Sequence, residues 1–92
     1  FWEELTMKFI NHTVKDENGI HARPAGAVAA EAKKFSSDIT VTLGEKSVNC
    51  KKIFALMGMG IKHGDTIRIN IDGPDEEAAL IAISDVLRSE RI

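Results

Sequence analysis

The stretch with the clearest chemical potential covers residues 18–26, where a single histidine lies between turn residues and a helix-forming run. Asn18-Gly19 is a turn dipeptide, and Pro24 is tolerated in the first turn of a helix because its missing N–H has no partner to lose there. The residues that follow are strong helix formers without a further proline. The sequence therefore predicts a helix that begins directly after His21, with the imidazole near the helix N-cap.

A histidine in this position could carry a phosphoryl group. The first N–H groups of the helix, from Ala22 and Arg23, and the positive end of the helix dipole point towards it, and the Arg23 guanidinium adds a permanent charge. Such a place suits an anion such as phosphate. Positive charge also disfavours the imidazolium form, so we expect a neutral imidazole that can act as a nucleophile. The alternative is that His21 is only a polar cap on an ordinary helix.

Further blocks of the chain extend this motif into a family resemblance. Residues 19–25 resemble the active-site signature of HPr, the histidine-containing phosphocarrier family of the sugar phosphotransferase system. The likeness continues through residues 46–54 and 59–64 and into the helix expected after residues 73–75. It covers residues 7–90, and the histidine motif is highly specific when the second block follows at this distance.

The resemblance implies a function and a site. His21 would accept a phosphoryl group from the histidine of enzyme I, through Nδ1, and pass it to enzyme IIA domains of sugar transporters. Arg23 would balance the charge of the phosphoryl group, the amides of Ala22 and Arg23 would donate to it, and Asn18 occupies a family position that supports the histidine side. The protein would be a stoichiometric transfer protein rather than an independent enzyme, and it would need no cofactor or metal.

The same resemblance implies a surface on which partners dock around His21. We expect it on the short second helix and just after it, at Lys51, Lys52, Ile53, Phe54, Met57 and Gly60. An apolar patch ringed by lysines suits a partner surface with an acidic rim. The alternative is that Ile53 packs inward and that Phe54 and Met57 are ordinary surface residues.

Lys52 departs from the family pattern, because many HPr proteins carry a serine there that a regulatory kinase phosphorylates. Lysine cannot accept that phosphate, so we expect no such switch. Two further alternatives are a non-transferring regulatory module of the same fold and a carrier domain of a larger phosphotransferase protein. The presence of His21 argues against the first, and the absence of an initiator Met permits the second.

The bulk composition is that of a small globular protein. The 92 residues, 43% hydrophobic and 28% charged, are expected to form one domain, with residues 1–5 as an N-terminal extension. The net charge of −2 argues against nucleic-acid binding. The sequence contains no apolar run of about 18 residues, the length that would predict membrane insertion. The single cysteine, Cys50, can form no internal disulfide, which fits a reducing cytoplasm. We expect the protein to be a monomer.

Hydrophobic periodicity predicts four strands and three helices. Alternation predicts strands over residues 6–14, 39–43, 46–49 and 66–71, and an apolar stripe predicts helices over 22–35, from 50 or 51 to 57, and from 73–75 through 87. Strands that are apolar on one face belong to a mostly antiparallel sheet with one solvated face. The expected fold is therefore an α+β open-faced two-layer sandwich, a four-stranded antiparallel sheet covered on one face by three helices in the order βαββαβα.

The remaining histidines are expected to be structural. His12 lies on the expected core face of the first strand, where we expect a hydrogen-bonded, partly buried side chain. A metal site built from His12, His21 and His63 matches no common ligand spacing, so we expect no metal.

Overall fold

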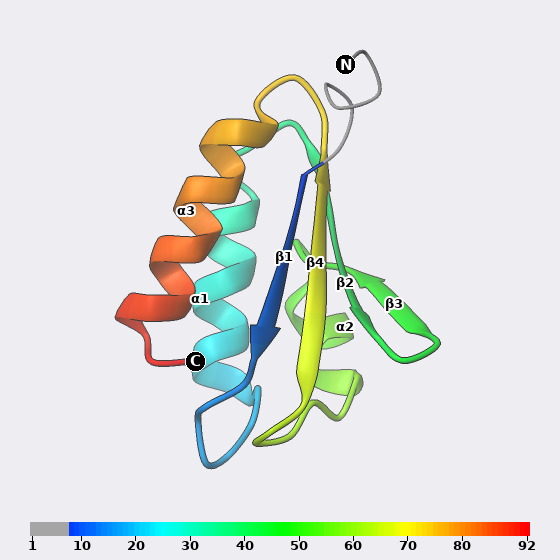
Figure 1. The fold of residues 1–92 in the computed structure, drawn as a ribbon, viewed down its shortest axis with the longest axis vertical. Coiled ribbons are helices and arrows are strands. Elements are labelled where there is room, and N and C mark those ends of the chain that lie inside the picture. The colour runs from blue at the N-terminus through cyan, green and yellow to red at the C-terminus, as the bar shows by residue number, and fades with distance from the viewer. Residues whose placement is uncertain (1–7) are drawn as a thin grey trace.

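The computed structural model describes residues 8–92, which follow the order β-α-β-β-α-β-α (Figure 1). The extension expected at residues 1–5 and the expected start of the first strand lie outside the described residues. The strands are β1 (Lys8–Thr13), β2 (Asp38–Leu43), β3 (Lys46–Asn49) and β4 (Thr66–Asp72). The helices are α1 (Ala22–Ala32), α2 (Ile53–Gly58) and α3 (Glu76–Ser89).

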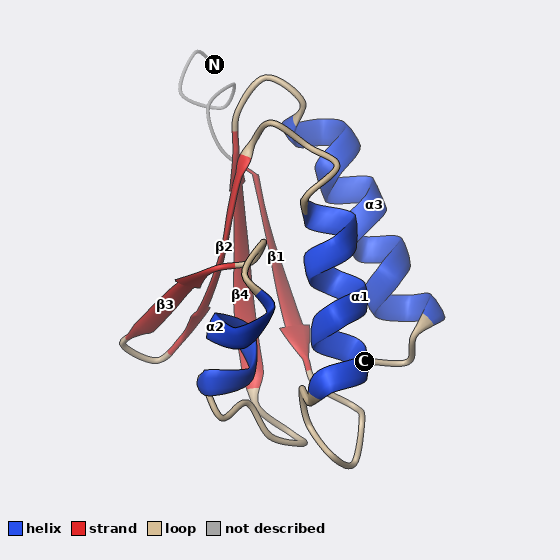
Figure 2. Cartoon of the chain, turned by 180° about the vertical axis from the view of Figure 1, so that it is seen from behind, coloured by secondary structure: helices blue, strands red, loops and turns tan. Residues whose placement is uncertain are grey.

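The four strands form one antiparallel sheet in the order β1-β4-β2-β3. In β4, one of the two inner strands, Ile69 lies opposite Ile10 of β1 on one side and Val41 of β2 on the other. The isoleucines of β4 are buried, whereas Thr66 and Arg68, which alternate with them along the strand, are exposed. The helices cover the buried face, with α1 and α3 side by side (Figures 1 and 2). The expected fold class is confirmed.

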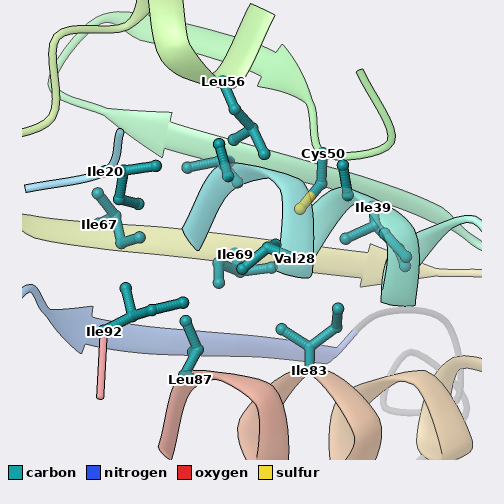
Figure 3. Packing of buried hydrophobic residues seen from close by; sticks show 14 of the residues in the cluster. Ile20, Val28, Ile39, Cys50, Leu56, Ile67, Ile69, Ile83, Leu87 and Ile92 are labelled. Atoms are coloured by element: carbon teal, nitrogen blue, oxygen red, sulfur yellow. The ribbon is translucent and has the colours of Figure 1, made fainter. Parts of the chain in front are cut away.

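The core lies between this sheet and the helices (Figure 3). It is built mainly from aliphatic side chains of the sheet, of α1 and of α3, and it includes the Cys50 thiol, which is fully buried. Burial in apolar surroundings raises the pKa of Cys50 to about 12, so the side chain stays a neutral thiol and packs as a small apolar group.

The end of α1 and the start of α2 differ from the sequence prediction for local reasons. Helix α1 ends at Ala32 instead of residue 35, because the chain tightens there into i→i−3 hydrogen bonds, from Lys34 N–H to the Glu31 carbonyl and from Phe35 N–H to the Ala32 carbonyl. Helix α2 begins only at Ile53, because the Asn49 side chain accepts the N–H of Lys51 at 2.9 Å and holds a turn in front of it.

Asp75 ties the start of α3 to the connection after α1. Its carboxylate accepts the backbone N–H of Ser36 at 2.8 Å, and the N–H and hydroxyl of Ser37 at 2.9 and 2.5 Å. These hydrogen bonds, with the Ser37 hydroxyl as the largest contribution, hold the pKa of Asp75 below its usual range. The carboxylate therefore links α3 to the segment that leads from α1 into β2.

His12 lies on the inner side of β1, as its position in the alternation predicts, and it is partly buried. The expected hydrogen bond is missing at one ring atom: Nε2 is buried and has no hydrogen-bond partner among the described residues. The ring lines a cavity of about 540 Å³ between β1 and the end of α3, together with apolar side chains and three basic ones. His12 therefore lies beside a cavity between β1 and the end of α3.

Candidate functional site

His21 is the N-cap residue of α1, with extended backbone angles of φ −109° and ψ −165°. Its carbonyl accepts the N–H of Ala25 at 2.9 Å, but its ring makes no capping hydrogen bond with the described residues. Pro24 has no N–H, so the amides of Ala22 and Arg23 are the donors at the helix start that lack an intrahelical acceptor. The imidazole is 38% exposed. This helix start therefore presents N–H donors and a partly exposed ring to an incoming anion.

The loop that carries His21 is packed closely against the loop after α2. The N–H of Ile20 donates to the carbonyl of Ile61 at 3.1 Å, and Ile20 itself is buried. Gly19 has φ +67°, and a Cβ there would collide with the Ile61 carbonyl oxygen. Only glycine allows both this backbone angle and this close approach.

Replacing Gly19 with alanine is therefore expected to destabilise the protein and to loosen the loop that carries His21. The left-handed backbone alone costs roughly 1–2 kcal/mol, and displacement of the Ile61 backbone adds to that cost. Gly44→Ala is the matched control, because Gly44 has φ +61° but nothing within 4 Å of its added Cβ. Urea denaturation should show a clearly larger loss for Gly19→Ala; equal losses would mean that the close contact does not matter.

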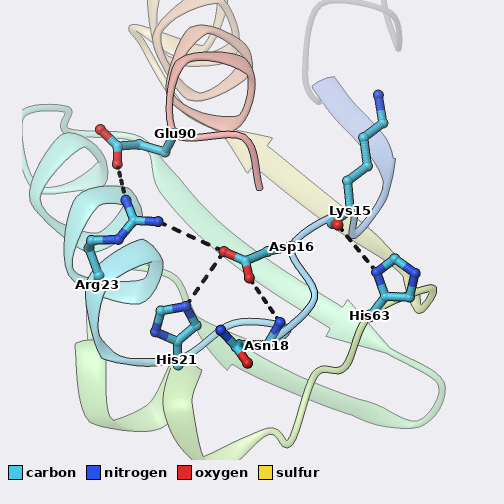
Figure 4. Close-up of polar contacts among 7 residues, drawn as sticks. All are labelled: Lys15, Asp16, Asn18, His21, Arg23, His63 and Glu90. Atoms are coloured by element: carbon cyan, nitrogen blue, oxygen red, sulfur yellow. Dashed lines mark hydrogen bonds and ion pairs between the residues drawn. The ribbon is translucent and has the colours of Figure 1, made fainter.

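Asp16 faces both side chains of the histidine motif (Figure 4). Its Oδ2 lies 3.5 Å from Nε2 of His21 and 3.9 Å from Nη2 of Arg23, while Oδ1 accepts the N–H of Asn18 at 2.9 Å. The Asn18 hydrogen bond, followed by the charges of His21 and Arg23, holds the pKa of Asp16 below its usual range although partial burial opposes this. Asp16 is therefore an anion next to the imidazole, and it was missed in the sequence-based site.

Arg23 is engaged by carboxylates in this structure. Its Nη1 donates to Oε1 of Glu90 at 2.8 Å, and its Nη2 faces Asp16 (Figure 4). The guanidinium side chain remains 62% exposed, so further N–H groups face solvent. Asp16 and Glu90 therefore place negative charge beside Arg23 and His21, a feature that the sequence analysis did not include.

Two other residues of the expected phosphate site lie where the motif places them. Ala22 is exposed as the first residue of α1. Asn18 is exposed in the preceding turn, where its backbone N–H is used by Asp16. The site thus brings together the four residues expected from the sequence, Asn18, His21, Ala22 and Arg23. The structure adds Asp16, from the same loop, and Glu90, which directly follows α3.

The expected docking residues divide into two groups. Lys51 and Ile53 are partly used inside the fold: the Lys51 ammonium donates to the Phe35 carbonyl at 2.8 Å, and Ile53 Cδ1 packs against Gly26 of α1. The exposed group consists of Lys52, Phe54, Met57 and Gly60, and we call it the docking surface. Phe54 is 82% exposed. Because the bond between Ile20 and Ile61 joins the two loops, this surface lies beside the loop of His21.

No helix within residues 8–92 combines the length and apolar character needed to cross a bilayer. Over the same residues, no three His, Cys, Asp or Glu side chains come together in a way that could hold a metal ion.

Comparison with known proteins agrees with this geometry. Residues 10–89 match the family model described as the PTS HPr component phosphorylation site. The phosphocarrier protein HPr of Mycoplasma genitalium is 45% identical over 87 residues, which are 94% of this chain and 99% of that protein. A solved histidine-containing phosphocarrier protein of Mycoplasma superposes with a TM-score of 0.89 at 41% identity, covering 90% of this chain and 94% of the other.

A crystal structure of an HPr dimer from Thermoanaerobacter tengcongensis matches with a TM-score of 0.72 at 37% identity, over 88% of this chain and 93% of that one. Fold and site together define a small histidine phosphocarrier. The chain belongs to the HPr family, the phosphocarriers of the phosphotransferase system.

Proposed function

We propose that His21 accepts a phosphoryl group from the phosphohistidine of enzyme I and passes it to enzyme IIA domains of the sugar phosphotransferase system. The observation that carries the proposal is a partly exposed imidazole at a helix start whose amides are not capped by a side chain. Membership of the HPr family supports the same role. The protein is then a stoichiometric carrier, and no metal or cofactor takes part in its half of the reaction.

The transfer is a displacement between two imidazoles. A ring nitrogen of His21 bonds to phosphorus while the bond between phosphorus and the donor nitrogen breaks, and that electron pair returns to the donor ring. The transition state needs positioning and charge stabilisation more than covalent chemistry from the protein. Two features support this step: the amides of Ala22 and Arg23 lack an intrahelical acceptor and can donate to phosphoryl oxygens, and the Asn18 N–H bonds to Asp16 in the turn before them.

In the proposed transfer, the Arg23 guanidinium contacts two carboxylates and must also bind the phosphoryl group. Its guanidinium has five N–H donors, of which the Glu90 contact at 2.8 Å uses one. The exposed side of the guanidinium can therefore receive a phosphoryl group, either with Glu90 still bound or after that ion pair opens. An exposed ion pair of this kind is worth roughly 0–1 kcal/mol, so opening it is a small cost.

The docking surface is the place where we propose that both partners bind. Phe54 and Met57 supply apolar area, Lys52 supplies charge, and Gly60 leaves room for close approach of a partner. We also propose that the protein acts in the cytoplasm as a monomer. The buried, neutral thiol of Cys50 suits a reducing compartment.

Incubation of the purified protein with enzyme I and labelled phosphoenolpyruvate tests this function. We expect uptake of one phosphate for each chain, in a bond that acid breaks and base leaves intact, followed by loss of the label when an enzyme IIA domain is added. Uptake without onward transfer would rule out the enzyme IIA domain as the acceptor of the phosphoryl group. No uptake at all would leave the non-transferring regulatory module as the better description.

A further inference from the structure

We infer that Asp16 is a positioning residue that keeps a proton on Nε2 of His21 and so leaves the lone pair of Nδ1 available for phosphoryl transfer. The inference rests on the proposed function of His21 and adds a part of the site that the histidine motif does not contain. Asp16 lies five residues before His21, in the turn that leads into α1 (Figure 4).

The Asp16 carboxylate is itself held in place. Oδ1 accepts the N–H of Asn18 at 2.9 Å, which leaves Oδ2 directed at the imidazole, and the side chain is only 13% exposed. The histidine ring is more exposed than the carboxylate that faces it. The partly buried carboxylate, anchored by a backbone N–H, is the more fixed of the two groups, so we expect it to orient the ring rather than the reverse.

The chemistry of the two groups fixes the tautomer. An ionised carboxylate can only accept hydrogen bonds, so the ring atom that faces it is favoured in its N–H form. The separation of 3.5 Å between Nε2 and Oδ2 is that of an ion pair, and such contacts in an unliganded site are often longer than in the reacting complex. With the proton on Nε2, the neutral ring has its lone pair on Nδ1, and the described residues make no capping bond to the ring.

The reaction balances without any proton leaving the site. Nδ1 bonds to phosphorus as the donor N–P bond breaks, and the ring then has a phosphoryl group on Nδ1 and the original proton on Nε2, with a formal positive charge that Asp16 offsets. In the second transfer the N–P bond breaks, its electron pair returns to Nδ1, and a neutral ring remains. Asp16 thus stabilises the ring-protonated phosphohistidine, whose imidazole leaves as a neutral group.

Asp16→Asn tests the inference, because the amide oxygen can still accept the Asn18 N–H while the carboxylate charge is lost. Glu17→Gln is the matched control: it removes one carboxylate from the neighbouring, exposed position of the same turn. The ¹⁵N chemical shifts of the His21 ring at alkaline pH, where imidazole is neutral, report the tautomer directly. We expect the Nε2–H form to dominate in the wild type and in Glu17→Gln, and its share to fall severalfold in Asp16→Asn.

The phosphorylated proteins give a second measurement. Loss of a charge-assisted contact should slow phosphoryl uptake from enzyme I by roughly tenfold in Asp16→Asn, with Asp16→Glu restoring part of the rate. A structural role alone would change folding but not the tautomer ratio. An unchanged ratio in Asp16→Asn overturns the inference. If even the wild type takes up no phosphate, the proposed function fails, while the ¹⁵N measurement still decides the role of Asp16.

Discussion

Replacing His21 with alanine is expected to abolish phosphoryl uptake from enzyme I completely, with little effect on folding. The imidazole is the only nucleophile in the proposed transfer, and neither Arg23 nor the helix amides can form the covalent bond in its place. The ring makes no capping hydrogen bond with the described residues and is 38% exposed, so its loss removes little packing. We expect a change in unfolding free energy of about 0.5 kcal/mol or less.

The measurement is acid-labile, base-stable label on the protein after incubation with enzyme I and labelled phosphoenolpyruvate. His63→Ala is the matched control, because His63 is an exposed histidine on the loop before β4. Its Nδ1 lies 3.2 Å from the Lys15 carbonyl oxygen. This variant should take up phosphate like the wild type. Label that persists in His21→Ala would move the phosphorylation site to another residue and refute the central proposal.

Much of the fold could be predicted from local sequence signals. The alternation of Ile67, Ile69 and Ile71 with polar residues predicts β4 and its buried face, and both are found. The turn and proline signals around His21 predict the start of α1 at Ala22. These features depend on residues close in sequence, where backbone preference and periodicity agree, and for that reason a single sequence is sufficient to predict them.

The carboxylates of the candidate site could not be predicted to the same extent. Glu90 contacts Arg23 across a separation of 67 residues, and nothing near Glu90 in the sequence indicates this contact. It arises because α1 and α3 pack side by side on the sheet, an arrangement that the Asp75 contacts to Ser36 and Ser37 help to hold. Asp16 had a local signal, since an aspartate two residues before Asn18 is a typical Asx turn, but its distance to the ring depends on tertiary structure.

The docking residues show a similar division. From the sequence, Lys51, Lys52, Ile53 and Phe54 form one continuous block. In the fold, the late start of α2 turns Ile53 towards α1 and leaves Phe54 in solvent, while Lys51 reaches back to the Phe35 carbonyl. Which lysine is available to a partner therefore depends on the boundary of a short helix, and boundaries are the least predictable feature of an element.

Phe54 is the residue of the docking surface with the largest apolar area to offer. It is 82% exposed. It also lines a shallow hollow of about 600 Å³ with Lys33, Lys51 and Lys52. A large aromatic side chain left in water at the start of a helix contributes little to the core, whereas a partner that covers it would gain its burial. The surrounding lysines favour a partner surface with acidic groups.

Phe54→Ala is accordingly expected to weaken binding of enzyme I and of an enzyme IIA domain by roughly tenfold or more, while the protein keeps its stability. Ile81→Ala is the matched control, because Ile81 is also a large exposed apolar side chain, 62% exposed, but lies on α3. Titration calorimetry with each partner gives the affinities, and thermal unfolding gives the stability. If the two variants bind equally well, apolar exposure on α2 has no special role in docking. A loss of affinity for only one of the two partners would mean that the docking surface binds that partner alone.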